Sequence, residues 1–231
     1  MKLRTQRPNA GITLLELLVA MTLFSLLSAA VLFSLRTATS TLERTRERIR
    51  DARKLEGAER ALERMLSGLL RIDAEFYEQG SNQPSFYLFF QGEPRAMRFV
   101  TSYSLQQGAR GAPHIVEFSV MPREDRQGVR LFVNELPYFG PASLGARMLG
   151  LQRDPAGGNP LMQFAPVVPG PQSFVLADRL PNCQFLYLDR FDLTYGDRWL
   201  PFWRDPILPR AIRIDMGTRA VTGQVYVSPI R

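Results

Sequence analysis

The chain begins with a long apolar stretch and continues in segments of regular spacing. After a short basic leader, the residues from Ile12 to Leu35 are uncharged and mostly apolar, with the single exception of Glu16. At a helical rise of about 1.5 Å per residue, this run can cross a hydrocarbon core about 30 Å thick. We therefore predict a transmembrane helix over residues 12–35.

The helical pattern continues beyond the apolar run. Apolar residues recur there at spacings that place them on one face of a helix. They are Leu55, Ala58, Leu62, Met65, Leu66, Leu69 and Ile72. We predict an amphipathic helix over residues 36–80 that packs on a sheet and ends at the Gly80–Pro84 cluster. The Ser40–Glu43 segment matches a capping box, which predicts a break or restart of the helix near Ser40.

From Ser85 onward, short segments rich in aromatic and β-branched residues replace the helical spacing. They are Phe86–Phe90, Ala96–Tyr103, His114–Met121, Val129–Glu135, Ser173–Ala177, Gln184–Leu188, Ala211–Met216 and Gln224–Val227. In Ala211–Met216 the isoleucines and the charged residues alternate, as in an antiparallel sheet with one face in water. The Gly- and Pro-rich stretch from Leu136 to Gln172 shows no clear element, and we interpret it as an interaction surface or a mobile insert. A β-rich domain is thus predicted over residues 81–231.

The composition allows one membrane helix and one globular domain. The chain has 231 residues, of which 45% are hydrophobic and 22% charged. Of the formal net charge of +7, three charges belong to Lys2, Arg4 and Arg7 in the leader, and the remainder of the chain carries +4. The arginines that follow Leu35 are interleaved with acids. This pattern is typical of a solvated helix face, and we predict no nucleic-acid partner.

Recognisable catalytic groups are missing from the sequence. His114 is the only histidine and Cys183 the only cysteine, which excludes an ordinary triad, a histidine-rich metal site and an intrachain disulfide. The best acidic cluster for a hard cation is Asp189, Asp192 and Asp197, whose spacing does not match an EF-hand loop. We predict no catalytic residue, no metal and no cofactor, and we expect the protein not to be an enzyme.

Glu16 is the residue that a plain membrane anchor does not explain. An ionised acid at the centre of a membrane helix costs about 2.5–3.5 kcal/mol, and such residues usually have a function. One alternative is a cleaved signal peptide, but its apolar region would be shorter, and the small residues Ser28–Ala30 are followed by further apolar sequence. Another alternative is that Glu16 lies near the membrane interface with its carboxylate in water.

The segment Gly11, Ile12, Thr13, Leu14, Leu15 and Glu16 resembles the prepilin signature of type IV pilins and type II secretion pseudopilins. The resemblance implies a leader peptide over residues 1–11, cut by a prepilin peptidase between Gly11 and Ile12, and N-methylation of Ile12. It also implies that Glu16 faces the N-terminal amine of a neighbouring subunit and sets the register of assembly. The expected fold is α+β and pilin-like, with a long N-terminal hydrophobic helix packed on a C-terminal antiparallel β-sheet domain.

Topology follows from the same resemblance. Lysines and arginines near the two ends of the apolar run do not by themselves place the N-terminus inside. The prepilin peptidase works at the cytoplasmic face. We therefore expect a single-pass protein of the bacterial inner membrane, with a cytoplasmic leader and a periplasmic domain.

The C-terminal third carries a second resemblance, to J-type minor pseudopilins of type II secretion systems. Its pattern is the Asn182–Asp189 strand, then Trp199 and Trp203, then the Leu208–Ile214 segment. We expect the aromatic residues of the middle segment to anchor a loop on the sheet, with partner binding as the alternative. The single cysteine also differs from conventional major pilins, which commonly close their C-terminal region with a disulfide.

These resemblances lead to a functional hypothesis. We predict a minor pseudopilin at the tip, or at the start of assembly, of a periplasmic pseudopilus. The implied partners are I- and K-type minor pseudopilins, the major pseudopilin and secreted substrate proteins. Two alternatives stay open: a minor pilin of a type IV pilus or competence system, and a membrane-anchored periplasmic binding domain or enzyme.

Overall fold

The structure is a computed structural model that describes residues 13–78, 80–152, 161–171, 173–192, 196–217 and 220–224. The chain divides into two compact units, Met1–Ala52 and Arg53–Arg231, and one helix continues through the boundary. The elements in chain order are α1 (Leu14–Ser67), β1 (Leu69–Leu70), β2 (Asp73–Phe76), β3 (Ser85–Leu88), β4 (Gln91–Gly92), β5 (Ala96–Ser104), β6 (Ala109–Pro122), β7 (Val129–Pro137), α2 (Pro141–Gly145), β8 (Met148–Gln152), β9 (Leu161–Phe164), β10 (Ser173–Leu180), β11 (Gln184–Asp192), β12 (Gly196–Leu200), β13 (Ala211–Asp215) and β14 (Ala220–Gln224).

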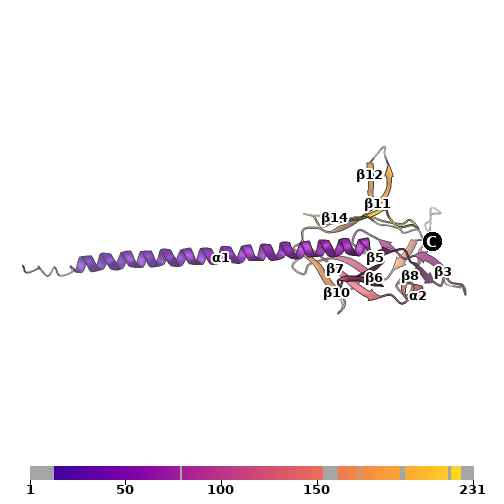
Figure 1. Ribbon diagram of the computed structural model, residues 1–231, viewed down its shortest axis with the longest axis horizontal. Coiled ribbons are helices and arrows are strands. Elements are labelled where there is room, and N and C mark those ends of the chain that lie inside the picture. The colour runs from indigo at the N-terminus through magenta and orange to yellow at the C-terminus, as the bar shows by residue number, and fades with distance from the viewer. Residues whose placement is uncertain are drawn as a thin grey trace, which may run out of the picture. The chain divides into compact units, whose positions relative to one another are not determined.

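Antiparallel sheets form the second unit. The main sheet has the order β1-β5-β6-β7-β10, and β4 also pairs with β5. A second sheet has the order β12-β11-β13-β14, and in Figure 1 the β11–β12 hairpin projects from it. Two further pairs, β2–β3 and β8–β9, complete the described strands. The expected α+β, pilin-like arrangement of an N-terminal apolar helix on antiparallel sheets is confirmed.

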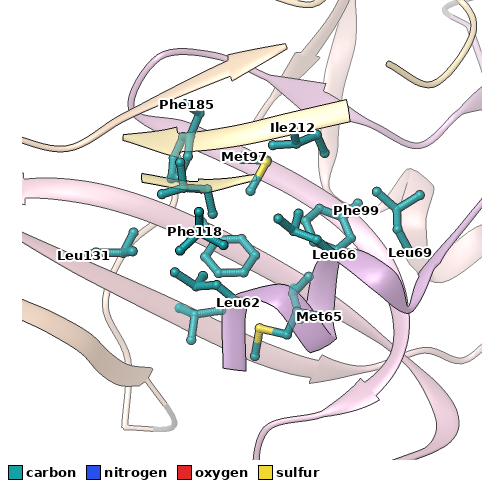
Figure 2. Close-up of a cluster of buried hydrophobic side chains, with 14 of the residues drawn as sticks. Leu62, Met65, Leu66, Leu69, Met97, Phe99, Phe118, Leu131, Phe185 and Ile212 are labelled. Carbon is teal, nitrogen blue, oxygen red and sulfur yellow. The ribbon is translucent and has the colours of Figure 1, made fainter. Parts of the chain in front are cut away.

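The larger core lies between the last turns of α1, one face of the main sheet and one face of the second sheet. Leu62, Met65 and Leu66 are fully buried, as their spacing predicts. Figure 2 shows Leu62 beside Phe118 of β6 and Leu66 beside Phe99 of β5, with Phe185 of the second sheet on the other side of Phe118. The Phe118 and Phe185 rings lie 6.3 Å apart in an edge-to-face arrangement.

Helix α1 ends earlier than the sequence pattern predicts. The expected end at Gly80–Pro84 is wrong, because Ser67 is the last helical residue and β1 follows it. The Thr101 hydroxyl of β5 donates to the Met65 carbonyl at 2.9 Å and closes the last turn. A Cβ on Gly68 would lie 2.7 Å from the Thr101 hydroxyl oxygen, so that only glycine fits at this exit. The expected break near Ser40 is also wrong, since α1 is continuous there.

A second, smaller core covers the opposite face of the main sheet. It is formed by buried residues from the main sheet, from β2 and the residue after β3, and from the chain between β7 and β10. They are Ala74, Phe89, Val100, Ile115, Leu144 and Met148. The interpretation of residues 136–172 as a stretch without elements is therefore wrong, because α2, β8 and β9 lie within it and bury apolar side chains.

Of the predicted strands, the seven between Phe86 and Met216 are confirmed as β3, β5, β6, β7, β10, β11 and β13, with shifts of up to five residues at their ends. The eighth, Gln224–Val227, overlaps β14 only at Gln224, and its other residues lie outside the described part of the chain.

Candidate assembly site

The N-terminal half of α1 presents an apolar surface. Leu14, Leu17 and Phe24 are each more than half exposed, like most of the other large apolar residues of this segment. Within the described residues, one helix is long and apolar enough to cross a membrane, Leu14–Glu43. The hydroxyl of Thr22 donates to the Val19 carbonyl at 2.8 Å, so that this polar group is satisfied within the helix.

Glu16 and Thr13 together cap the first turn of this helix. The Glu16 N–H donates to Thr13 Oγ1 at 3.2 Å, and the Thr13 N–H donates to Glu16 Oε2 at 3.4 Å. This reciprocal arrangement is a capping box, in which the two side chains satisfy backbone donors that the helix leaves unpaired. A negative charge in the first turn also interacts favourably with the helix dipole.

The other predicted residues of this site are Gly11 and Ile12, which lie outside the described part of the chain. Cleavage between them and methylation of Ile12 stay predictions. Thr13, by contrast, gains a role that the pattern analysis did not assign to it. Its signal was present, because a threonine three residues before a glutamate at the start of an apolar run is a capping-box sequence.

A row of polar side chains crosses the face of the main sheet that the smaller core covers. Its members are opposite one another in register on five strands: Gln91↔Arg98, Arg98↔Glu117, Glu117↔Asn134 and Asn134↔Ser173. Arg98 Nε donates to Glu117 Oε1 at 2.8 Å, and Arg98 Nη1 donates to Gln91 Oε1 at 2.9 Å. Arg98 is 1% exposed. Burial lowers the pKa of the Arg98 guanidinium, and the Glu117 carboxylate opposes that shift.

Side chains of this polar row form hydrogen bonds with the backbone of the segment that follows β9. Arg98 Nη2 donates to the Ala165 carbonyl, and Asn134 Nδ2 donates to the Val168 carbonyl at 3.0 Å. The Ser173 hydroxyl accepts the Gly170 N–H at 2.6 Å. The sequence pattern does not reveal this row, although Arg98 and Glu117 stand out as charges within otherwise apolar strands.

The single histidine and the single cysteine contact groups that stabilise the fold. His114 Nδ1 lies 2.7 Å from the Ala112 carbonyl, and Nε2 lies 3.7 Å from Glu135 Oε1. The Leu105 N–H donates to Glu135 Oε2 at 2.7 Å, so that this carboxylate holds the β5–β6 turn. Cys183 is buried in the larger core, and burial raises its pKa to about 12.

Metal-binding groups do not converge in the part of the chain that the structure describes: no three histidine, cysteine or acidic side chains there could share an ion. In the acidic cluster considered above, the side chain of Asp192 lies outside the described residues.

The aromatic residues of the C-terminal third have different environments. Trp203 is buried, its Nε1–H donates to the Ile207 carbonyl at 2.6 Å, and its backbone N–H donates to the Gly92 carbonyl at 2.8 Å. A Cβ on Gly92 would lie 2.5 Å from the Cβ of Trp203, so that this close approach requires glycine. The expected anchoring role is confirmed for Trp203, whereas Phe202 is 46% exposed and Trp199 is half-buried on β12.

Comparison with known protein families gives one match. Residues 6–32 match the model of the prokaryotic N-terminal methylation motif. This is the motif of type IV pilin-like prepilins, and it implies processing by a prepilin peptidase. A search of curated proteins finds no match to the chain.

Proposed function

We propose that the protein is a minor pseudopilin of a type II secretion system, most like the J type. In this proposal, prepilin peptidase cuts between Gly11 and Ile12, Ile12 is methylated, and α1 enters a periplasmic pseudopilus near its tip. The protein acts by assembly, without chemistry of its own. Its anchor lies in the inner membrane, its leader in the cytoplasm and its β-rich domain in the periplasm.

One observation supports the prepilin part of the proposal. The methylation motif, matched over residues 6–32, includes the start of a helix of membrane length whose first turn holds a single acid, Glu16. In an apolar filament core, a positively charged N-terminal amine from a neighbouring subunit would neutralise this carboxylate. Attraction between the two charges increases as the local dielectric constant falls, and desolvation offsets part of the gain. Such a pair sets the register between subunits more than it adds stability.

The J-type assignment is supported by the order of elements in the C-terminal third. Strand β11 is followed by β12, which carries Trp199, then by the Trp203 anchor, and then by β13. The free, buried Cys183 is also consistent with a subunit other than a conventional major pilin.

Partner association tests the proposal. The tagged full-length chain is produced in its own host, and the membrane fraction is cross-linked and purified. We expect I- and K-type minor pseudopilins in the purified complex, and we expect deletion of the gene to stop protein export. Co-purification with pilus subunits instead, together with normal export in the deletion strain, would reassign the protein to a type IV pilus or competence system.

A further inference from the structure

The β-rich unit has a groove of about 620 Å³ that the proposed filament role does not use. One wall is the chain from Tyr87 to Glu93, the second is β9 together with Leu149 and Gln152 of β8, and the third is the segment from Phe202 to Pro206. Apolar side chains from all three walls line it, including Phe90, Met162 and Phe202. A space of this size and lining fits a few residues of an extended peptide.

The second wall is the edge of a strand. Within the described residues, β9 pairs with β8 alone. The Ala165 N–H donates to the Arg147 carbonyl at 3.1 Å, which makes the Met148↔Phe164 pair a non-hydrogen-bonded one. The N–H and C=O groups of Phe164 therefore point away from β8. The register shift in this pair lies on β8, between Met148 and Gly150, and β9 has no extra residue there, so the groups of Met162 point the same way by alternation along β9. All four residues of β9 line the groove, which therefore extends along the whole strand.

The polar row fixes the position of this edge. Arg98 donates to the Ala165 carbonyl directly after β9, and its guanidinium lies 5.4 Å from the centre of the Phe164 ring. The Phe164 ring also packs edge-to-face on Phe89 at 5.6 Å. Because Arg98 is itself held by Glu117, the edge of β9 is ordered before any partner arrives. Such preorganisation lowers the entropic cost of binding.

Charge favours a basic partner. The charged side chains that line the groove are Glu93, Arg204 and Asp205. The Arg204 guanidinium lies 5.6 Å from the centre of the Phe202 ring, and both acids are exposed. A lysine or arginine beside the apolar residues of a ligand would complement this lining.

We propose that this groove binds an extended segment of a partner protein, which adds to β9 as a further strand. Main-chain hydrogen bonds to Met162 and Phe164 would hold the segment, alternate apolar side chains would enter the groove, and a basic residue would face Glu93 and Asp205. This inference does not depend on the type of filament to which the protein belongs.

A displayed library of random dodecapeptides, selected on the full-length chain in lipid nanodiscs, supplies the probes. Selected peptides are made with a fluorescent label, and their affinities are measured by fluorescence polarisation. We expect Met162→Pro, which removes an outward N–H, to weaken binding about tenfold or more, whereas Met162→Leu keeps the N–H and the affinity. The double variant Glu93→Gln/Asp205→Asn is expected to weaken binding and to reduce its dependence on salt.

A second measurement does not require a variant to fold. N-methylation at every other residue of a selected peptide removes half of its main-chain donors. We expect one of the two alternating patterns to abolish binding to the wild-type chain and the other to preserve it. The proposal is overturned if no peptide is enriched, or if binding is indifferent both to Met162→Pro and to the alternating N-methylation.

Discussion

At the scale of single residues, Glu16 has two possible partners that compete for one carboxylate. In the single chain, it accepts the Thr13 N–H and caps its own helix. In a filament, the amine that cleavage creates at Ile12 of a neighbouring subunit would offer a full positive charge instead. Exchange of a neutral donor for a charged one strengthens a hydrogen bond, and it does so most where water is excluded. Glu16 is therefore expected to matter more for assembly than for the fold of the single chain.

Replacement of Glu16 tests this expectation. We predict that Glu16→Ala and Glu16→Val are still processed by prepilin peptidase but enter the filament at least about tenfold less than the wild type, which corresponds to about 1.4 kcal/mol. Intact mass reports processing, and cross-linking followed by sedimentation reports incorporation. Glu43→Ala, which removes an exposed acid farther along the same helix, is the matched control and is expected to assemble normally. Normal assembly of both Glu16 variants would remove the role assigned to this carboxylate.

Cys183 gives a second prediction at this scale. Its pKa is raised from 9.0 to about 12 because the thiol is buried. At pH 8 we expect the folded protein to resist Ellman's reagent and the guanidinium-unfolded protein to react at once, because the thiolate is the nucleophile. The thiol also links stability to pH. Its contribution is complete below about pH 9 and is lost as the pH rises toward about 12. Fast labelling of the folded protein at pH 8 would contradict the buried position.

At the scale of elements, the polar row explains how a Gly- and Pro-rich connection becomes ordered. The chain after β9 lacks regular backbone pairing, so its carbonyl groups need partners from the sheet. Arg98 and Asn134 supply them at Ala165 and Val168. The same connection carries α2 and the β8–β9 pair, whose apolar side chains contribute to the smaller core. The polar side chains of the row therefore help to position the apolar side chains of α2, β8 and β9.

A double-mutant cycle tests the central pair of this row. We predict that Arg98→Met and Glu117→Leu each destabilise the protein by about 3–5 kcal/mol, because each leaves an uncompensated buried charge. The double variant should be closer to the wild type than the sum of the two losses, since it removes both charges. Thermal unfolding of the full-length chain, followed by tryptophan fluorescence, measures the three differences. Additive losses would mean that the two side chains do not act as a pair.

At the scale of the whole molecule, the sequence contains enough to predict the fold class but not the end of α1 or the site geometry. The strand patterns from Phe86 to Met216 predict seven strands correctly, because alternation of burial follows from the pleat of a strand. Helical spacing continues to Ile72, yet the helix ends at Ser67, because Gly68 and Thr101 meet across a tertiary contact. Such a contact has no signature in local spacing.

The polar row and the groove also depend on tertiary contacts that local sequence spacing does not predict. Arg98 and Glu117 are conspicuous in the sequence, but their pairing depends on the register of β5 and β6. The edge of β9 was not predicted, because four residues between glycines and prolines give too short a pattern. The N-terminal site is different. Its residues are consecutive, and a local motif was therefore sufficient to predict it, as the family match at residues 6–32 confirms for the motif.

The most direct test of the account is the mass of the mature N-terminus. The full-length chain is co-produced with a prepilin peptidase, and its N-terminal peptide is analysed by mass spectrometry. We predict loss of residues 1–11 and one added methyl group on the Ile12 amine. Gly11→Ala is expected to block both changes. Gly57→Ala, at a helical glycine with open space around it, is the matched control and should be processed fully. An intact Met1–Gly11 leader on the wild-type chain, beside a control prepilin that is cut, would contradict the account.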